Sequence, residues 1–91
     1  MRALFYGQAE CLGQPVYYEL LADELTGDKE CYGLRVRCGE DTAEARDLTT
    51  SQRRIQELLD ALVRGAVTPI TTRDVVEDWL LADLAPAYSK E

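Results

Sequence analysis

Hydrophobic and polar residues alternate with a period of two through the first half of the chain. One face of segment 16–23 is apolar throughout, with Val16, Tyr18, Leu20 and Ala22. The other face is largely polar, with Tyr17, Glu19, Leu21 and Asp23. This pattern is typical of an antiparallel strand that buries one face. A second alternating run covers residues 32–38, and the turn-forming residues 26–29 predict that the two strands form a hairpin.

Two flanking segments complete the predicted sheet. Residues 3–9 contain strand-forming aromatic side chains, and residues 13–15 provide a turn into the next strand. Residues 42–48 follow a turn at residues 39–41 and alternate only weakly, which fits an edge strand. We therefore expect an antiparallel meander of three or four strands, one face of which needs a cover.

The period changes to 3.6 in the second half of the chain. Five apolar residues follow helical spacing and cover an arc of about 140°. They are Ile55, Leu58, Leu59, Leu62 and Val63. Thr49 and Gln52 form a predicted capping box at the start of this helix, and Gly65 is placed to end it.

A second helix is predicted beyond a connector at residues 67–70. Pro69 cannot donate a backbone hydrogen bond and disfavours helical conformation at the residue before it, so we expect Thr71 or Thr72 to cap the helix. The helix is expected to run to about Leu84, where a proline follows soon after. Its apolar arc is about 200° wide, against about 140° for the first helix.

Together these elements predict an α+β fold, in which the antiparallel meander of three or four strands is followed by two helices packed on one face. A chain of 91 residues fits one domain. We expect a single α+β domain over residues 1–85 and a short C-terminal tail over residues 86–91.

Four motifs carry a resemblance to a known family. They lie at residues 32–36 (YGLRV), 46–48 (RDL), 67–70 (VTPI) and 73–80 (RDVVEDWL). With them, residues 16–82 resemble a family of short uncharacterised proteins from Gram-positive anaerobic bacteria, described only as a domain of unknown function. Members often carry a histidine at the start of the last helix, where this chain has Thr71 and Thr72. The resemblance implies no activity, cofactor or partner.

The net charge of the chain indicates which classes of binding partner we expect and which we do not. Seventeen acidic and ten basic residues give a formal net charge of −7, and the chain has no histidine. Phosphate backbones attract lysine and arginine, so we do not expect this acidic chain to bind nucleic acid. The start of the chain lacks a cleavage signal, and no apolar run approaches the roughly 20 residues that cross a bilayer. We expect a cytoplasmic protein that does not associate with membranes.

The cysteines do not form a recognisable site. Cys11, Cys31 and Cys38 are an odd set, which argues against a disulfide framework. Structural zinc sites usually need four Cys or His ligands, and strand alternation puts Cys31 and Cys38 on opposite faces. Catalysis by a cysteine–histidine pair is excluded because the chain has no histidine. We expect no metal, no cofactor and no catalytic thiol.

Three carboxylates share one side of the second helix, at Asp74, Glu77 and Asp78. A solvated charged face is the expected role, and a carboxylate-based or metal-dependent site is the alternative. The chain has no glycine-rich phosphate loop, dinucleotide-binding fingerprint or calcium-loop spacing.

The wide apolar arc of the second helix leaves two arrangements open. The helix either lies between the sheet and the first helix, or part of it meets another chain. In the second arrangement we expect Val75, Trp79 and Ala82 to pack into the domain, and Leu80 and Leu84 to contact a partner or a second copy. The full candidate interaction surface is Val76, Leu80, Leu81, Leu84, Asp74, Glu77 and Asp78.

The leading functional hypothesis is a small non-enzymatic protein-interaction or regulatory module, with a homodimer as one of its forms. A small carboxylate-based or metal-dependent enzyme is the alternative. An acidic mimic of nucleic acid ranks third, because the acidic residues are interleaved with arginines.

Overall fold

The computed structural model describes residues 1–25, 27 and 29–84, with side chains of the last helix described as far as Leu81. The elements are β1 (Arg2–Cys11), β2 (Gln14–Glu24), β3 (Glu30–Cys38), β4 (Asp41–Thr49), α1 (Gln52–Arg64) and α2 (Pro69–Leu84). The expected tail at residues 86–91 lies outside the described residues. No helix in the described part of the chain is long and apolar enough to span a membrane.

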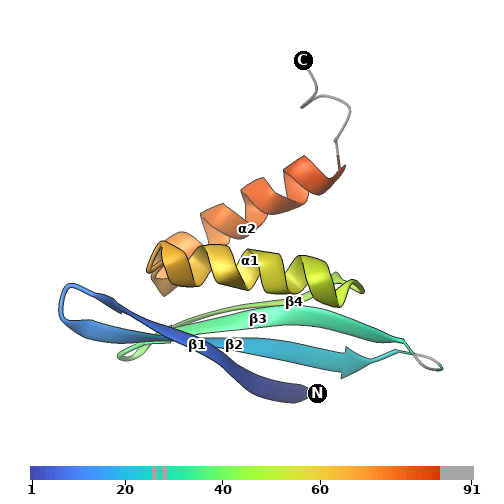
Figure 1. The fold of residues 1–91 in the computed structure, drawn as a ribbon, viewed down its shortest axis with the longest axis horizontal. Coiled ribbons are helices and arrows are strands. Elements are labelled where there is room, and N and C mark those ends of the chain that lie inside the picture. Colours follow the sequence, from blue (N-terminus) through green and yellow to red (C-terminus); the bar gives the residue numbers. More distant parts are fainter. Residues whose placement is uncertain (26, 28, 85–91) are drawn as a thin grey trace.

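The predicted α+β fold is confirmed, with four strands. The sheet is antiparallel throughout, in the order β1-β2-β3-β4, so each strand pairs with its neighbour in sequence. Both helices lie on one face of the sheet, which we call the helix face, and the other face is the open face (Figure 1). α1 runs along the sheet, whereas α2 leans away from it toward its C-terminal end (Figure 1).

The core forms between the helix face and α1. The alternation in β2 is confirmed: Val16, Tyr18, Leu20 and Ala22 are all buried. They are joined by Leu34 and Val36 of β3. Against these strand residues, α1 buries the predicted stripe of Ile55, Leu58, Leu59 and Leu62, and Val63 packs at its margin. The two periods therefore meet along one apolar layer.

A bulge in β4 accounts for its weak alternation. Leu34 pairs with Ala45 and Tyr32 pairs with Thr49, so residues 46–48 of β4 face only Gly33 of β3. A Cβ atom on Gly33 would lie 2.2 Å from the Ala45 carbonyl oxygen, which shows that β4 closes directly over this glycine. Leu21 pairs with Gly33 and is buried although it belongs to the open face. The expectation of a polar open face is thus wrong at Leu21.

The ends of α1 differ in detail from the predicted caps. The Thr49 hydroxyl accepts the backbone N–H of Ser51 at 3.1 Å, ahead of the helix, and is not the N-cap. Ser51 is the N-cap instead, and its hydroxyl accepts the backbone N–H of Arg54 at 3.3 Å. Gly65 caps the C-terminus as predicted, but with φ −88°, and the left-handed conformation falls on Ala66 with φ 48°.

α2 starts at Pro69, two residues before Thr71 and three before Thr72, the two predicted caps. Pro69 is its first residue, a position where the missing N–H costs nothing. The Thr68 carbonyl accepts the backbone N–H groups of Thr71 and Thr72. It also accepts a hydrogen bond from the Thr72 hydroxyl at 2.7 Å, so this buried polar side chain keeps a hydrogen-bond partner.

Two tyrosines tie the helical layer to the sheet and predict a loss of stability in alkali. The hydrogen bond to Asp60 raises the pKa of Tyr6 from 10.0 to about 12, and burial raises that of Tyr18 to about 12. Because the folded state holds these protons more tightly, their contribution to stability is complete below pH 10 and is lost as the pH rises toward about 12.

Tyr18→Phe tests this dependence. Loss of the 2.9 Å hydrogen bond from its hydroxyl to the Val67 carbonyl should cost about 1 kcal/mol at neutral pH. The variant should also lose less stability than the parent between pH 8 and pH 11, in urea denaturation at both values. An unchanged slope with pH would contradict the assignment.

Candidate interaction surface

α2 buries one side of ordinary width. Thr72 and Val76 are buried, and Val75, Trp79 and Leu80 are partly buried. At 100° per residue these five positions span about 140°, as wide as the stripe of α1. They pack mainly on β4 and β3, and Trp79 also meets the guanidinium group of Arg54 on α1, 5.3 Å from the ring centre. The other two members of the predicted arc, Ala82 and Leu84, have side chains outside the described residues.

The predicted surface needs correction at Val76 and in its choice of flank. Val76 is 5% exposed and belongs to the core, so it is not available for a contact. Leu80 is half-buried against the core rather than turned outward. Leu81, by contrast, is 65% exposed. The side chains of Leu84 and Ala82 lie outside the described residues. Asp74, Glu77 and Asp78 are all exposed.

Four exposed residues form a second side of α2, which we call the outer flank. Ile70, Arg73, Glu77 and Leu81 lie within about 80° of arc, next to the buried side. Ile70 is 81% exposed, so an apolar side chain stands uncovered at each end of the flank, with the two charged residues between. Asp74 and Asp78 point farther round, toward solvent.

A groove runs between the outer flank and β4. It consists of two adjoining cavities of about 230 and 120 Å³, which share Ala43 and Arg73. The first cavity is closed by Asp41, Pro69 and Ile70, and the second extends past Ala45 to Glu77. Arg73 and Ala43 thus line both parts of the α2–β4 groove, and Glu77, Glu44 and Ala45 line only its second part.

The floor of this groove is a free strand edge. β4 is the last strand of the sheet, so alternate N–H and C=O groups point away from β3. The two-residue loop at residues 39–40 closes β3 and β4 with the hydrogen-bonded pair Cys38–Asp41. Alternation from that pair leaves the backbone groups of Thr42 and Glu44 directed outward. Such an edge is a template for another strand.

The charges of the outer flank are uncompensated within the described residues. Neither Arg73 nor Glu77 has an ion-pair partner in the part of the chain that the structure describes. They are four residues apart on the helix yet do not pair with each other. Among the described residues, Arg73 and Glu77 are therefore each available for an ion pair with a group of opposite charge on a partner.

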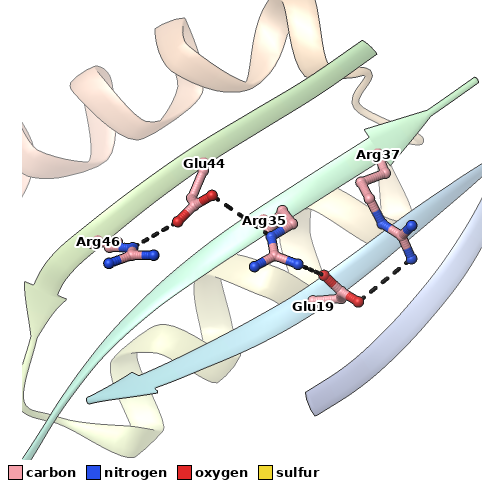
Figure 2. Close-up of polar contacts among 5 residues, drawn as sticks. All are labelled: Glu19, Arg35, Arg37, Glu44 and Arg46. Carbon is pink, nitrogen blue, oxygen red and sulfur yellow. Dashed lines mark hydrogen bonds and ion pairs between the residues drawn. The ribbon is translucent and has the colours of Figure 1, made fainter. Parts of the chain in front are cut away.

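The open face shows the opposite situation (Figure 2). A row of ion pairs crosses β4, β3 and β2: Arg46–Glu44 at 2.6 Å, Glu44–Arg35 at 3.7 Å, Arg35–Glu19 at 3.0 Å and Glu19–Arg37 at 3.5 Å. Each charge in the row is met by another from the same chain. The charged groups of this row are therefore already paired within the chain and are poorly suited to bind a partner's charges.

The carboxylates of α2 do not converge on a site. Within the described residues no group of three or more His, Cys, Asp or Glu side chains is placed to hold a metal ion. Asp74 and Asp78 line neither cavity of the α2–β4 groove, whereas Glu77 lines the second of them and a shallow hollow beside Leu80 and Leu81.

The three cysteines are free and occupy both faces of the sheet. Cys31 and Cys38 lie on opposite faces, as predicted from alternation. Cys11 and Cys38 sit on β1 and β3, on either side of β2, so their backbones are roughly 10 Å apart and too far for a disulfide. Burial and the neighbouring Asp47 carboxylate raise the pKa of the Cys31 thiol, which keeps it protonated.

Replacing Cys11, Cys31 and Cys38 together by alanine is expected to leave a cooperatively folding protein, weakened only by lost packing at the buried Cys31. Circular dichroism with urea denaturation measures this. About one zinc ion per purified chain, with unfolding when it is chelated, would overturn the expectation.

The sequence patterns did not single out Ile70 or Arg73, and they predicted residues 42–48 as an edge strand without placing that edge beside the second helix. Ile70 was assigned to a connector, because Pro69 was expected to delay the helix, and Arg73 stood among acidic neighbours without a visible role. The spacing of 70, 73, 77 and 81 is itself a helical stripe and is the signal that could have found the flank. The strand beneath it belongs to a distant segment, which no local pattern reveals.

Comparisons with known proteins identify a family but no activity. No curated protein and no solved structure matches the chain. A family model described as Family of unknown function (DUF6514) matches residues 7–82, which includes every element from the middle of β1 to most of α2. The chain therefore belongs to this family of unknown function, DUF6514.

Proposed function

We propose that the chain is a small non-enzymatic protein-interaction module whose contact surface is the outer flank of α2 together with the edge of β4. The observation that carries the proposal is the outer flank itself. It holds two exposed apolar side chains, Ile70 and Leu81, and two charges that have no ion-pair partner among the described residues, beside the edge strand of the described sheet. Surfaces that combine apolar side chains with unmet backbone groups are typical of protein contacts.

The compartment and origin belong to the same proposal. Three free thiols fit a reducing compartment, so we place the module in the cytoplasm. The resemblance of its motifs implies a Gram-positive anaerobic bacterium as the source.

The other functional hypotheses have less support. A carboxylate-based or metal-dependent enzyme would need partly desolvated acids, whereas Asp74, Glu77 and Asp78 are exposed. A nucleic-acid mimic would need rows of unpaired acids, whereas Glu19 and Glu44 are paired with arginines.

Leu81→Glu tests the proposed surface. With the wild-type chain as bait in an extract of the native cell, we expect recovered proteins, which include further copies of the chain, to be lost in this variant. The fold should persist, because Leu81 is not part of the core. Mass spectrometry of the recovered proteins measures the change.

Phe5→Glu is the matched control, since Phe5 has the same 65% exposure but lies on β1, at the other edge of the sheet. It should recover the same proteins as the wild type. Identical recovery by a folded Leu81→Glu variant would contradict the proposed surface.

A further inference from the structure

We infer that the partner of this surface is a second copy of the chain, docked about a two-fold axis that pairs the two β4 edges and the two outer flanks. The inference rests on the proposed function, because it names the occupant of the same surface. It rests on two observations: the order of residues along the outer flank, and the position of β4 beneath that flank.

The outer flank is complementary to itself. Along α2 its residues run apolar, basic, acidic, apolar, in the order Ile70, Arg73, Glu77 and Leu81. When a second copy of this helix is placed antiparallel about an axis perpendicular to the sheet, Arg73 faces the partner's Glu77 near the axis. The apolar ends of the two flanks do not meet, because α2 leans away from the sheet and its two ends lie at different heights above it (Figure 1). A two-fold axis forms each contact twice.

The strand edge supports the same axis independently. Along the α2–β4 groove, Arg73 and Ala43 line both cavities, whereas Glu77, Glu44 and Ala45 line only the second. An axis midway between Arg73 and Glu77 therefore falls near residues 43–45 of β4, and we place it at Glu44, whose backbone groups are directed outward. In this register the outward-directed N–H and C=O groups of one β4 strand lie opposite those of the partner's β4 strand, as an antiparallel ladder requires. Two four-stranded sheets would become one continuous sheet.

The charges at the centre of the interface are compatible with this register. The two Glu44 side chains face each other on the open face, and like charges directly opposite are unfavourable. Each Glu44, however, is already held between Arg46 at 2.6 Å and Arg35 at 3.7 Å, so each brings its own compensation. The net charge of −7 per chain opposes association at long range, so the strand ladder must supply most of the affinity.

Charge reversal at the reciprocal pair tests the inference. In sedimentation equilibrium over roughly 1 µM to 1 mM, the wild-type chain should dimerise, and Arg73→Glu and Glu77→Arg should each weaken dimerisation at least about tenfold. The double variant Arg73→Glu/Glu77→Arg restores opposite charges across the axis and should return to within about threefold of the wild type. Arg64→Glu, which makes the same change of charge on α1, should dimerise like the wild type.

Two results would overturn the inference: a wild-type chain that is monomeric throughout, or a folded double variant as weak as the single ones. If a monomeric wild type still recovers another protein through Leu81, only the identity of the partner is wrong. If Leu81→Glu also changes nothing in that recovery, the proposed function fails as well.

Discussion

Gly33→Ala is expected to destabilise the protein by at least about 3 kcal/mol, the upper end of the cost of overpacking. The new Cβ would lie 2.2 Å from the Ala45 carbonyl oxygen and 2.8 Å from the Arg46 Cα. Both obstacles are backbone atoms of the β4 bulge, so no side chain can rotate out of the way. Relief requires β4 to move off β3 at the point where Leu21 is buried.

Gly65→Ala is the matched control for this prediction. Its Cβ would meet the Val67 side chain at 3.3 Å, and its φ of −88° suits any residue. Urea denaturation of both variants should therefore show a large loss for Gly33 and a change below about 1 kcal/mol for Gly65. Similar small losses in both would mean that β4 does not close over Gly33.

Leu59→Ala is expected to cost about 2–5 kcal/mol. Leu59 is fully buried at the centre of the α1 stripe, between Ile55 and Leu62 and above the side chains of β2 and β3. Truncation leaves a cavity that the flanking side chains can fill only in part. Against a total stability of about 5–15 kcal/mol, this loss is a large fraction of the whole.

Leu81→Ala provides the comparison, because Leu81 is as hydrophobic as Leu59 but 65% exposed. We expect its free energy of unfolding to change by less than about 0.5 kcal/mol at concentrations where the chain is monomeric. Equilibrium denaturation in urea measures both variants. A loss under about 1 kcal/mol for Leu59→Ala would show that the core is centred elsewhere.

The elements with one-sided burial could be predicted from the sequence. In β2 and α1 the period of the apolar residues decides which face is buried, and this information lies within each segment. Val16, Tyr18, Leu59 and Leu62 are buried for that reason. The order of the strands followed from short turns, since a loop as short as residues 39–40 can only join antiparallel neighbours.

The bulge and the start of α2 depended on contacts between distant segments. Residues 46–48 leave the ladder because Gly33, on another strand, gives the backbone room to approach. Ser51 rather than Thr49 caps α1, because β4 continues through Thr49 and the helix begins at Gln52. α2 starts at Pro69 because the Thr68 carbonyl receives the first hydrogen bonds of the helix.

The candidate site was predicted in part. Leu81 and Glu77 both belong to the predicted surface: Glu77 is part of the acidic cluster on α2, and Leu81 is the apolar residue that lies among those acids. The rotation of α2 about its axis could not be predicted, because Val75, Val76 and Leu80 are all apolar and the sequence of the helix does not show which of them is buried. Small side chains at Ala43 and Ala45 leave room for Val76 beside them. Ile70 and Arg73 gain their role only from the groove that β4 forms with α2.

Amide hydrogen exchange at Thr42 and Glu44 tests most directly whether the β4 edge and the outer flank form an interface. In the wild-type chain, at concentrations where it dimerises, these two amides should exchange at least about tenfold more slowly than in Arg73→Glu. Ala43 and Ala45 should be protected in both proteins, because their amides bond to β3. Equal and fast exchange at Thr42 and Glu44 in the two proteins, with Ala43 and Ala45 protected, would show that the β4 edge stays open and would contradict the interface.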